Sequence, residues 1–196
     1  REKNQQAFAD RLDWCRKHNL YVLVNLHVPP GHTNIIRPTD DSIFESGRYW
    51  EDFEKFWSEL LNTYKNDMTI AGWEFFNEPL IPAHMSESIW HTRVEQFLQK
   101  MRDIDQNHIF FVGYPQGQVK TRTMHGGHEI DWTFLALRKY ADPNIAYVLH
   151  FYEPIKFTHQ GASPDLVGGI KYPRQAFTFR KYLTSSDSLP QEKVEK

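Results

Sequence analysis

Four short apolar runs alternate along the chain with longer segments in which apolar residues recur every three or four positions. The runs lie at residues 21–27, 70–76, 109–113 and 145–152. Each is rich in β-branched or aromatic side chains and too short for an ordinary helix, so each is predicted to be a strand. The strands are apolar throughout, which is typical of strands buried on both faces of a parallel sheet.

The segments between the runs carry the spacing of amphipathic helices. Helices are predicted at about residues 4–18, 48–64 and 86–105, with a short one near 131–140 and a weaker one at 174–184. Ser86 is a plausible N-cap for the third helix. Residues 31–47 and 114–130 are expected to be loops. The alternation of strand and helix predicts one α/β domain over residues 1–184, followed by a polar, disordered tail at 185–196.

Polar side chains follow the C-terminal end of each predicted strand. They are His27, then Asn77 and Glu78, then Tyr114, then His150 and Tyr152. An α/β barrel would gather these ends into one ring, which is where such barrels carry their chemistry. Pro79 disfavours the helical conformation at Glu78 and stops strand pairing, so it would hold the Asn-Glu pair at the strand's end. Taken alone, Asn77-Glu78-Pro79 could equally be an ordinary turn.

Composition excludes several classes of function. The net charge is −2 and no basic face is apparent, so nucleic acid is not expected as a partner. The single cysteine, Cys15, allows no internal disulfide; it lies within a predicted helix and is expected to be a small residue of the protein core. No apolar run reaches membrane-spanning length, and no glycine-rich phosphate loop follows a strand. His125-Gly-Gly-His128-Glu129 is weak evidence for a metal site, so no metal or cofactor is expected.

Several segments together resemble glycoside hydrolase family 5. They are Val24-Asn25-Leu26-His27, Gly72-Trp73-Glu74 with Asn77-Glu78-Pro79, and His150-Phe151-Tyr152-Glu153-Pro154. Phe157-Thr158-His159-Gln160-Gly161-Ala162 also resembles a segment common in bacterial members. Asn-Glu-Pro is shared by many related glycosidases, whereas its combination with His-x-Tyr is much narrower. The order and spacing of these segments match over nearly the whole chain.

The resemblance implies a (β/α)8 barrel that hydrolyses β-linked polysaccharides such as cellulose, mixed-linkage glucan or mannan with retention. Glu78 would be the general acid/base, and Asn77 would hydrogen-bond the sugar 2-hydroxyl. His27 matches the histidine that ends the family's third strand. His150 would orient the sugar and the acid/base, and Tyr152 would lie near the nucleophile. Two carboxyl groups about 5 Å apart are what a retaining glycosidase needs.

Tyr114, which follows the third predicted strand, is expected to contact sugar at the rim. Trp90 and Trp132 could stack on sugar rings or belong to the core at a helix start. His159 and Gln160 are expected to hold the loop after the last strand by side-chain hydrogen bonds.

The chain also departs from the family's pattern. Its strands match the third to sixth of eight, and no glutamate stands in the family's Gly-Glu-Phe-Gly-like nucleophile context. The family's arginine from the second strand and tryptophan from the eighth have no counterpart either. Glu74 is expected to lie too deep in the strand to replace the nucleophile, and Glu153 is expected in a loop. The chain is therefore predicted to be a partial barrel that is inactive alone.

Two other possibilities stay open from the sequence. One is a non-catalytic partial barrel that binds carbohydrate. The other is association of two chains, or of this chain with the missing barrel strands, through unpaired strand edges. A polymeric substrate implies a secreted or periplasmic protein, although the sequence shows no signal peptide.

Overall fold

The computed structural model describes part of the chain. The described residues are 2–29, 31, 43, 47–81, 85–113, 115, 117–122, 128–131, 138–150, 152 and 155–162. The chain divides into two compact units, Arg1–Leu149 and His150–Lys196. Each unit is described by itself below.

The first unit is built on a four-stranded parallel sheet in the order β1-β2-β4-β7. The strands are β1 (Val22–Asn25), β2 (Ile70–Glu74), β4 (Ile109–Gly113) and β7 (Ile145–Val148). They fall inside the four predicted runs, and strand order follows chain order. The predicted parallel α/β architecture is confirmed.

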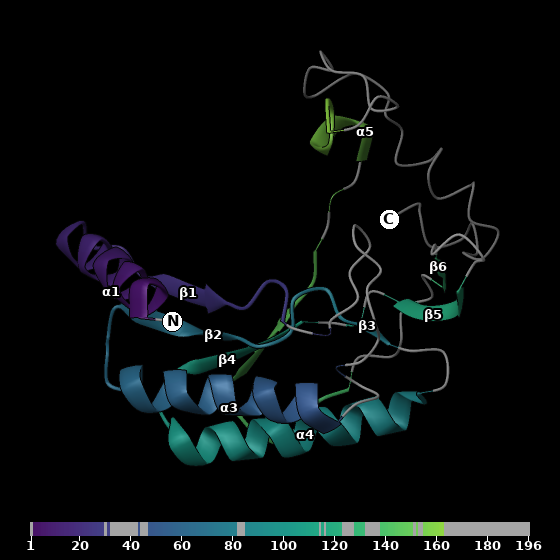
Figure 1. Ribbon diagram of the computed structural model, residues 1–196, viewed down its shortest axis with the longest axis horizontal. Helices are drawn as coiled ribbons and strands as arrows, with labels where there is room; N and C mark the ends of the chain where they lie inside the picture. Colours follow the sequence, from purple (N-terminus) through teal and green to yellow (C-terminus); the bar gives the residue numbers. More distant parts are fainter. Residues whose placement is uncertain are drawn as a thin grey trace, which may run out of the picture. The chain divides into compact units, whose positions relative to one another are not determined.

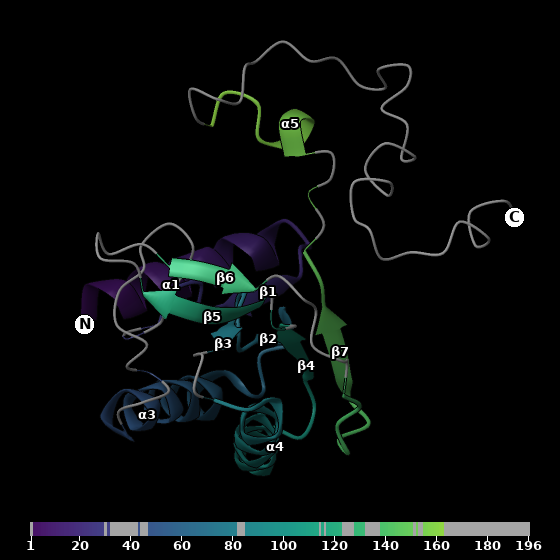
Figure 2. The ribbon, with the colours of Figure 1, turned by 90° about the vertical axis from the view of Figure 1, so that its right-hand side faces the viewer.

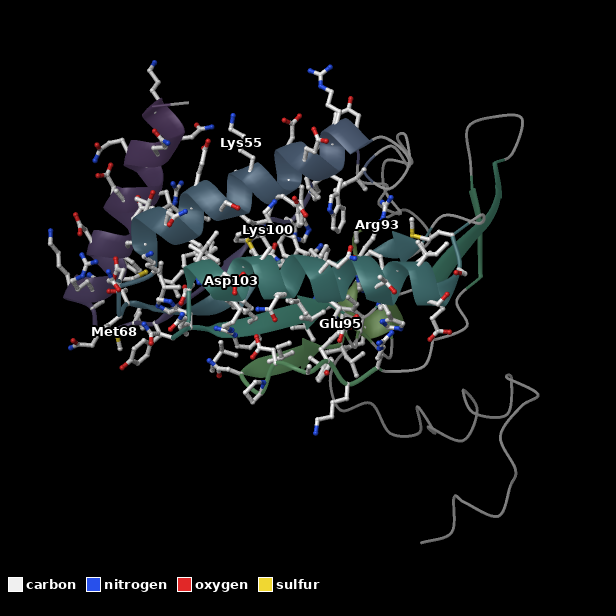
Figure 3. The ribbon with its side chains drawn as sticks, turned by 90° about the horizontal axis from the view of Figure 1, so that it is seen from below. Lys55, Met68, Arg93, Glu95, Lys100 and Asp103 are labelled. Atoms are coloured by element: carbon white, nitrogen blue, oxygen red, sulfur yellow. The ribbon has the colours of Figure 1, made fainter. Side chains whose placement is uncertain are left out.

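Three long helices accompany these strands. They are α1 (Glu2–Lys17), α3 (Gly47–Tyr64) and α4 (Glu87–Ile104). Helices α3 and α4 lie side by side on one face of the sheet (Figure 1). Ser86 caps α4 as predicted, because its hydroxyl accepts a hydrogen bond from the Ile89 amide at 3.4 Å. Across the two helices, Lys100 Nζ lies 2.6 Å from Glu54 Oε2. Figure 3 shows the two helices from their outer side, with Lys55 on α3 and with Lys100 and Asp103 on α4.

The two faces of the sheet differ in burial. Trp73 and Phe110, neighbours in register on β2 and β4, are completely buried on the helix side. On the other face Leu23 is 43% exposed and Ile109 is 38% exposed. The expected burial on both faces therefore holds for the central strand β2 and is wrong for Leu23, for Ile109 and for Tyr147 of β7, which is 39% exposed. Leu23 lies on β1, which pairs on one side only within the described part of the chain.

Aromatic side chains form the core between the sheet and the helices. Phe75 lies with its ring centroid 4.8 Å from that of Trp57 on α3 and 5.0 Å from that of Phe97 on α4, both edge to face. Such pairs add to the free energy gained from burying the large ring surfaces. The high aromatic content of the sequence is thus used mainly for packing.

A buried polar cluster joins the N-terminal ends of the strands. The Asp105 carboxylate accepts hydrogen bonds from the Trp73 indole at 2.7 Å and from the His108 amide at 3.1 Å, and His108 Nδ1 lies 2.7 Å from the same carboxylate. Burial alone would raise the pKa of Asp105. The hydrogen bonds from the His108 amide, the Trp73 indole, the Asn107 amide and the His108 ring outweigh burial and lower this pKa.

The region predicted as a loop at 114–130 contains an antiparallel hairpin instead, which corrects that prediction. Strands β5 (Gly117–Arg122) and β6 (His128–Asp131) pair with each other, as Figure 2 shows. Strand β5 also pairs in parallel with β3 (Leu80–Ile81), which makes a second sheet of three strands. The chain after Pro79 therefore returns at once to regular structure.

The remaining predictions of elements have mixed outcomes. Asp131 lies in β6 and residues 138–140 are not helical, so the bounds predicted for a helix at 131–140 are wrong; residues 132–137 lie outside the described ranges. The second unit contains α5 (Ile155–Thr158), where a loop was expected. The predicted helix at 174–184 and tail at 185–196 lie outside the described residues. Among the helices that are described, none has the length and apolar character to cross a membrane.

Candidate active site

The end of β2 is anchored in the aromatic core before it reaches the polar pair. Beyond Glu74 the Phe75 amide still donates to the Phe111 carbonyl at 3.2 Å. The next ring, Phe76, stacks on Phe53 of α3 with centroids 5.4 Å apart and meets Trp90 of α4 edge-on at 5.3 Å. The backbone that enters Asn77 and Glu78 is therefore held by both helices.

Glu78 has an unusual backbone conformation. Its φ is +45°, in the left-handed region, and its side chain is half-buried. The left-handed region costs a non-glycine residue about 1–2 kcal/mol. Pro79 does keep Glu78 out of the right-handed helical region, as expected, but Glu78 does not take the extended conformation usual before proline. Strained residues of this kind cluster at functional sites, where the surroundings hold them in place.

Asn77 ties the end of β2 to the end of β1. Its side chain is 8% exposed, and its Nδ2 donates to the backbone carbonyl of His27 at 3.4 Å. The His27 side chain is exposed to solvent. The structure thus brings His27, Asn77 and Glu78 to one edge of the sheet, at the C-terminal ends of neighbouring parallel strands.

His150 and Tyr152 belong to the second unit, where their rings lie edge to face with centroids 6.0 Å apart. Tyr152 also meets the His159 ring at 4.9 Å. The Thr158 hydroxyl donates to the Tyr152 carbonyl at 2.5 Å and lies 2.9 Å from His159 Nδ1. These contacts agree with the expected role of His159 in holding this segment. They add a role for Thr158, which the sequence showed only as part of the segment from Phe157 to Ala162.

Other candidates have plainer outcomes. Trp90 is 1% exposed and packs on Phe76, so it belongs to the core. Glu74 is 7% exposed within β2, between Asn25 and Phe111 in register, as expected for a structural residue. Tyr114, His125, Trp132 and Glu153 lie outside the described residues. Within the described ranges, no group of three or more His, Cys, Asp or Glu side chains could hold a metal ion.

A parallel sheet with intervening helices, and with polar residues at the carboxyl ends of its strands, is the arrangement found in α/β-barrel enzymes, of which four strands are present here. The sequence profile of cellulase (glycosyl hydrolase family 5) matches residues 1–189. The chain belongs to this family.

Curated relatives agree with that assignment. Cellodextrinase A of Ruminococcus flavefaciens is 27% identical over 160 residues, which are 81% of this chain and 44% of the relative. Endoglucanase C of Acetivibrio thermocellus is 27% identical over 175 residues, which are 86% of this chain and 47% of the relative. The chain thus spans about half the length of these relatives.

Solved structures show the same fold. Endoglucanase Cel5A of Thermotoga maritima aligns with a TM-score of 0.58 at 22% identity, over 83% of this chain and 46% of that one. Other structures of that protein hold cellobiose or mannotriose. The cellulose synthase subunit Z of Clostridioides difficile aligns with a TM-score of 0.62 at 19% identity, over 94% of this chain and 55% of that one.

Proposed function

We propose that this chain carries the acid/base half of a retaining endo-β-glycanase that cleaves β-1,4-linked polysaccharide. The observation that carries the proposal is the strained, half-buried Glu78 at the C-terminal end of a central barrel strand. Its immediate neighbour Asn77 is fixed to the adjacent strand. Membership of the cellulase family supplies the reaction class.

The roles follow from what retention requires. One carboxyl must protonate the leaving oxygen and then, as a carboxylate, take a proton from water. A second carboxylate, about 5 Å from the first, attacks the sugar and forms the glycosyl-enzyme. Glu78 is assigned the first role. Asn77 lies beside it with an amide that can bind a sugar hydroxyl without adding charge. His27, His150, Tyr152 and Tyr114 are assigned to substrate binding.

The substrate class rests on the relatives. Their names are endoglucanase and cellodextrinase, and a neighbouring structure of the same fold has been solved with both a glucan and a mannan oligosaccharide. We therefore assign a β-1,4-linked glucan as substrate, with mannan as the alternative to be tested. A polymeric substrate of this kind implies a secreted or periplasmic enzyme.

The nucleophile is assigned to barrel strands outside these 196 residues, because no glutamate here stands in the family's nucleophile context. On this proposal the 196-residue chain binds β-glucan oligosaccharides and does not hydrolyse them. Isothermal titration with cellohexaose, followed by analysis of released sugars, tests both parts. Release of sugar by the isolated chain would contradict the assignment, and binding without release would support it.

Replacing Glu78 tests the catalytic role in the full-length gene product. Glu78→Gln replaces the ionisable carboxyl by an amide that can neither give nor take the proton, while keeping the shape, so hydrolysis of polysaccharide should fall by about 100-fold or more. The matched control is Glu51→Gln, an exposed glutamate on α3, which should leave turnover unchanged. Equal turnover of the Glu78→Gln variant and its parent would refute the role of Glu78.

A further inference from the structure

Gly113, the last residue of β4, lies directly under the chain segment that carries Glu78. A Cβ atom placed on Gly113 would lie 1.7 Å from the Phe76 carbonyl oxygen and 2.9 Å from the Phe76 carbonyl carbon. It would also lie 3.4 Å from Pro79 Cδ. Gly113 thus faces both ends of the short stretch from Phe76 to Pro79.

The atom that a side chain at Gly113 would meet is backbone, so a rotamer change cannot relieve the overlap. Because Cβ contacts below 3.0 Å essentially do not occur, the two backbones would have to separate by about 1.3 Å. Pairing with β7, in which Gly113 is opposite Val148, restrains the β4 side. The rings around Phe76 restrain its side chain, so the peptide that leads into Asn77 has to move.

We propose that Gly113 is a positioning residue for the acid/base. By lacking a side chain it lets the Phe76–Asn77 peptide pack onto β4, and this close approach holds Glu78 in its left-handed conformation. The proposal rests on the assignment of Glu78 as the acid/base. Gly113 itself makes no contact with substrate in this account.

Gly72 is a matched control within the same sheet. A Cβ atom on Gly72 would lie 2.3 Å from the Ile109 carbonyl oxygen and 2.6 Å from the Phe111 ring. The overlap is again with backbone and again between β2 and β4. It occurs toward the N-terminal end of the strands, opposite Ile109 in register and away from Glu78. Gly72→Ala therefore reports the general cost of a methyl group between these strands.

The test compares Gly113→Ala and Gly72→Ala by NMR in the 196-residue chain. The Glu78 three-bond coupling between its amide and α protons reports φ, and the Asn77 side-chain amide signal reports its bond to His27. Both signals should change in Gly113→Ala and stay in place in Gly72→Ala, although both variants lose stability. Unchanged signals in Gly113→Ala, or equal changes in both variants, would overturn the proposal.

Two further readouts complete the test. In the full-length gene product, kcat should fall by about 100-fold in Gly113→Ala with little change in KM, because a shift of about 1 Å in a catalytic group can cost that much. If Gly113→Ala does not fold, the measurement is made on the unsubstituted chain. The proposal requires a nuclear Overhauser contact between the Gly113 α protons and the Pro79 δ protons, and the absence of this contact overturns the proposal. Neither NMR experiment depends on turnover. A failure of the proposed function can therefore be distinguished from a failure of the proposal for Gly113.

Discussion

Asp105 is a charged residue that the fold buries, and its burial is not apparent from the sequence. Its side chain is completely buried, yet hydrogen bonds from an indole and two backbone amides keep it charged. Because its pKa is lowered in the folded state, the unfolded chain binds protons more readily. The resulting stabilisation is complete above the ordinary aspartate pKa of about 4 and is lost as the pH falls below it through the folded-state value.

This reasoning predicts the pH dependence of stability. Asp105→Asn should lower the free energy of unfolding at pH 7 by about 3 kcal/mol, because the buried donors lose their charged acceptor. It should also flatten the decrease in stability between pH 5 and pH 3, measured by urea titration. Part of the decrease in stability should remain in the variant, because the pKa of Asp67 is also lowered in the folded state. Burial would raise this pKa, but hydrogen bonds from Thr69 and Arg16 lower it. Parallel curves for the variant and the parent would contradict the account.

For single residues, the sequence predicted which side chains follow the ends of the strands but not the backbone conformation in which they are held. Asn77 and Glu78 stand out because a polar pair interrupts an apolar run. The left-handed conformation of Glu78 and the need for glycine at position 113 depend on the approach of two strands, which no local pattern encodes. A glycine at the end of an apolar run was the available signal.

Arg102 joins three elements of the first unit. From α4 its guanidinium donates to the carbonyls of Asp105 and His108, to the Asn144 carbonyl before β7, and to Asp142 at 2.7 Å. The same group lies 3.5 Å from the centre of the Phe110 ring of β4. This geometry uses the planar, forked shape of arginine, which lysine lacks.

We therefore expect Arg102→Lys to lower the free energy of unfolding by about 2 kcal/mol, since partly buried carbonyls lose their donors although the charge is kept. Arg138→Lys is the control, because Arg138 lies at the surface, where its contact with Glu95 at 3.1 Å is exposed, and it should change stability little. Denaturant titration of both variants gives the comparison. Similar losses of stability in the two variants would show that the forked guanidinium of Arg102 does not contribute through its several hydrogen bonds.

Element predictions succeeded where burial and local spacing agree. The bounds of β4 match the prediction, and α4 begins at the predicted cap, because a buried apolar run and an amphipathic stripe have strong local signals. The hairpin β5–β6 was missed because Gly117–Arg122 has one apolar residue, Val119, among polar ones. Its pairing with β3 is a tertiary contact that sequence spacing does not show.

The whole first unit is an open section of an α/β barrel, and its two outer strands pair on one side only within the described residues. The fold class could be predicted because strand and helix alternate and because the family's segments occur in order. The expectation that His150 and Tyr152 bind substrate together with Glu78 stays a prediction.

The open sheet predicts a gradient of hydrogen exchange. Amides of β2 and β4, which have partners on both sides, should exchange more slowly than amides of β1 and β7. Exchange followed by NMR at several protein concentrations gives the measurement. Strong protection of β1 or β7 that grows with concentration would instead show that chains associate through these edges, and uniform protection at low concentration would contradict the open sheet.

The most direct test of the central claim is the response of a Glu78→Ala variant of the full-length gene product to the leaving group and to azide. If Glu78 is the acid/base, a dinitrophenyl cellobioside, whose leaving group needs no proton, should still form the glycosyl-enzyme intermediate. Azide should then accelerate turnover and give a β-glycosyl azide, because it attacks without a general base. Loss of activity that depends on neither the leaving group nor azide would contradict the account.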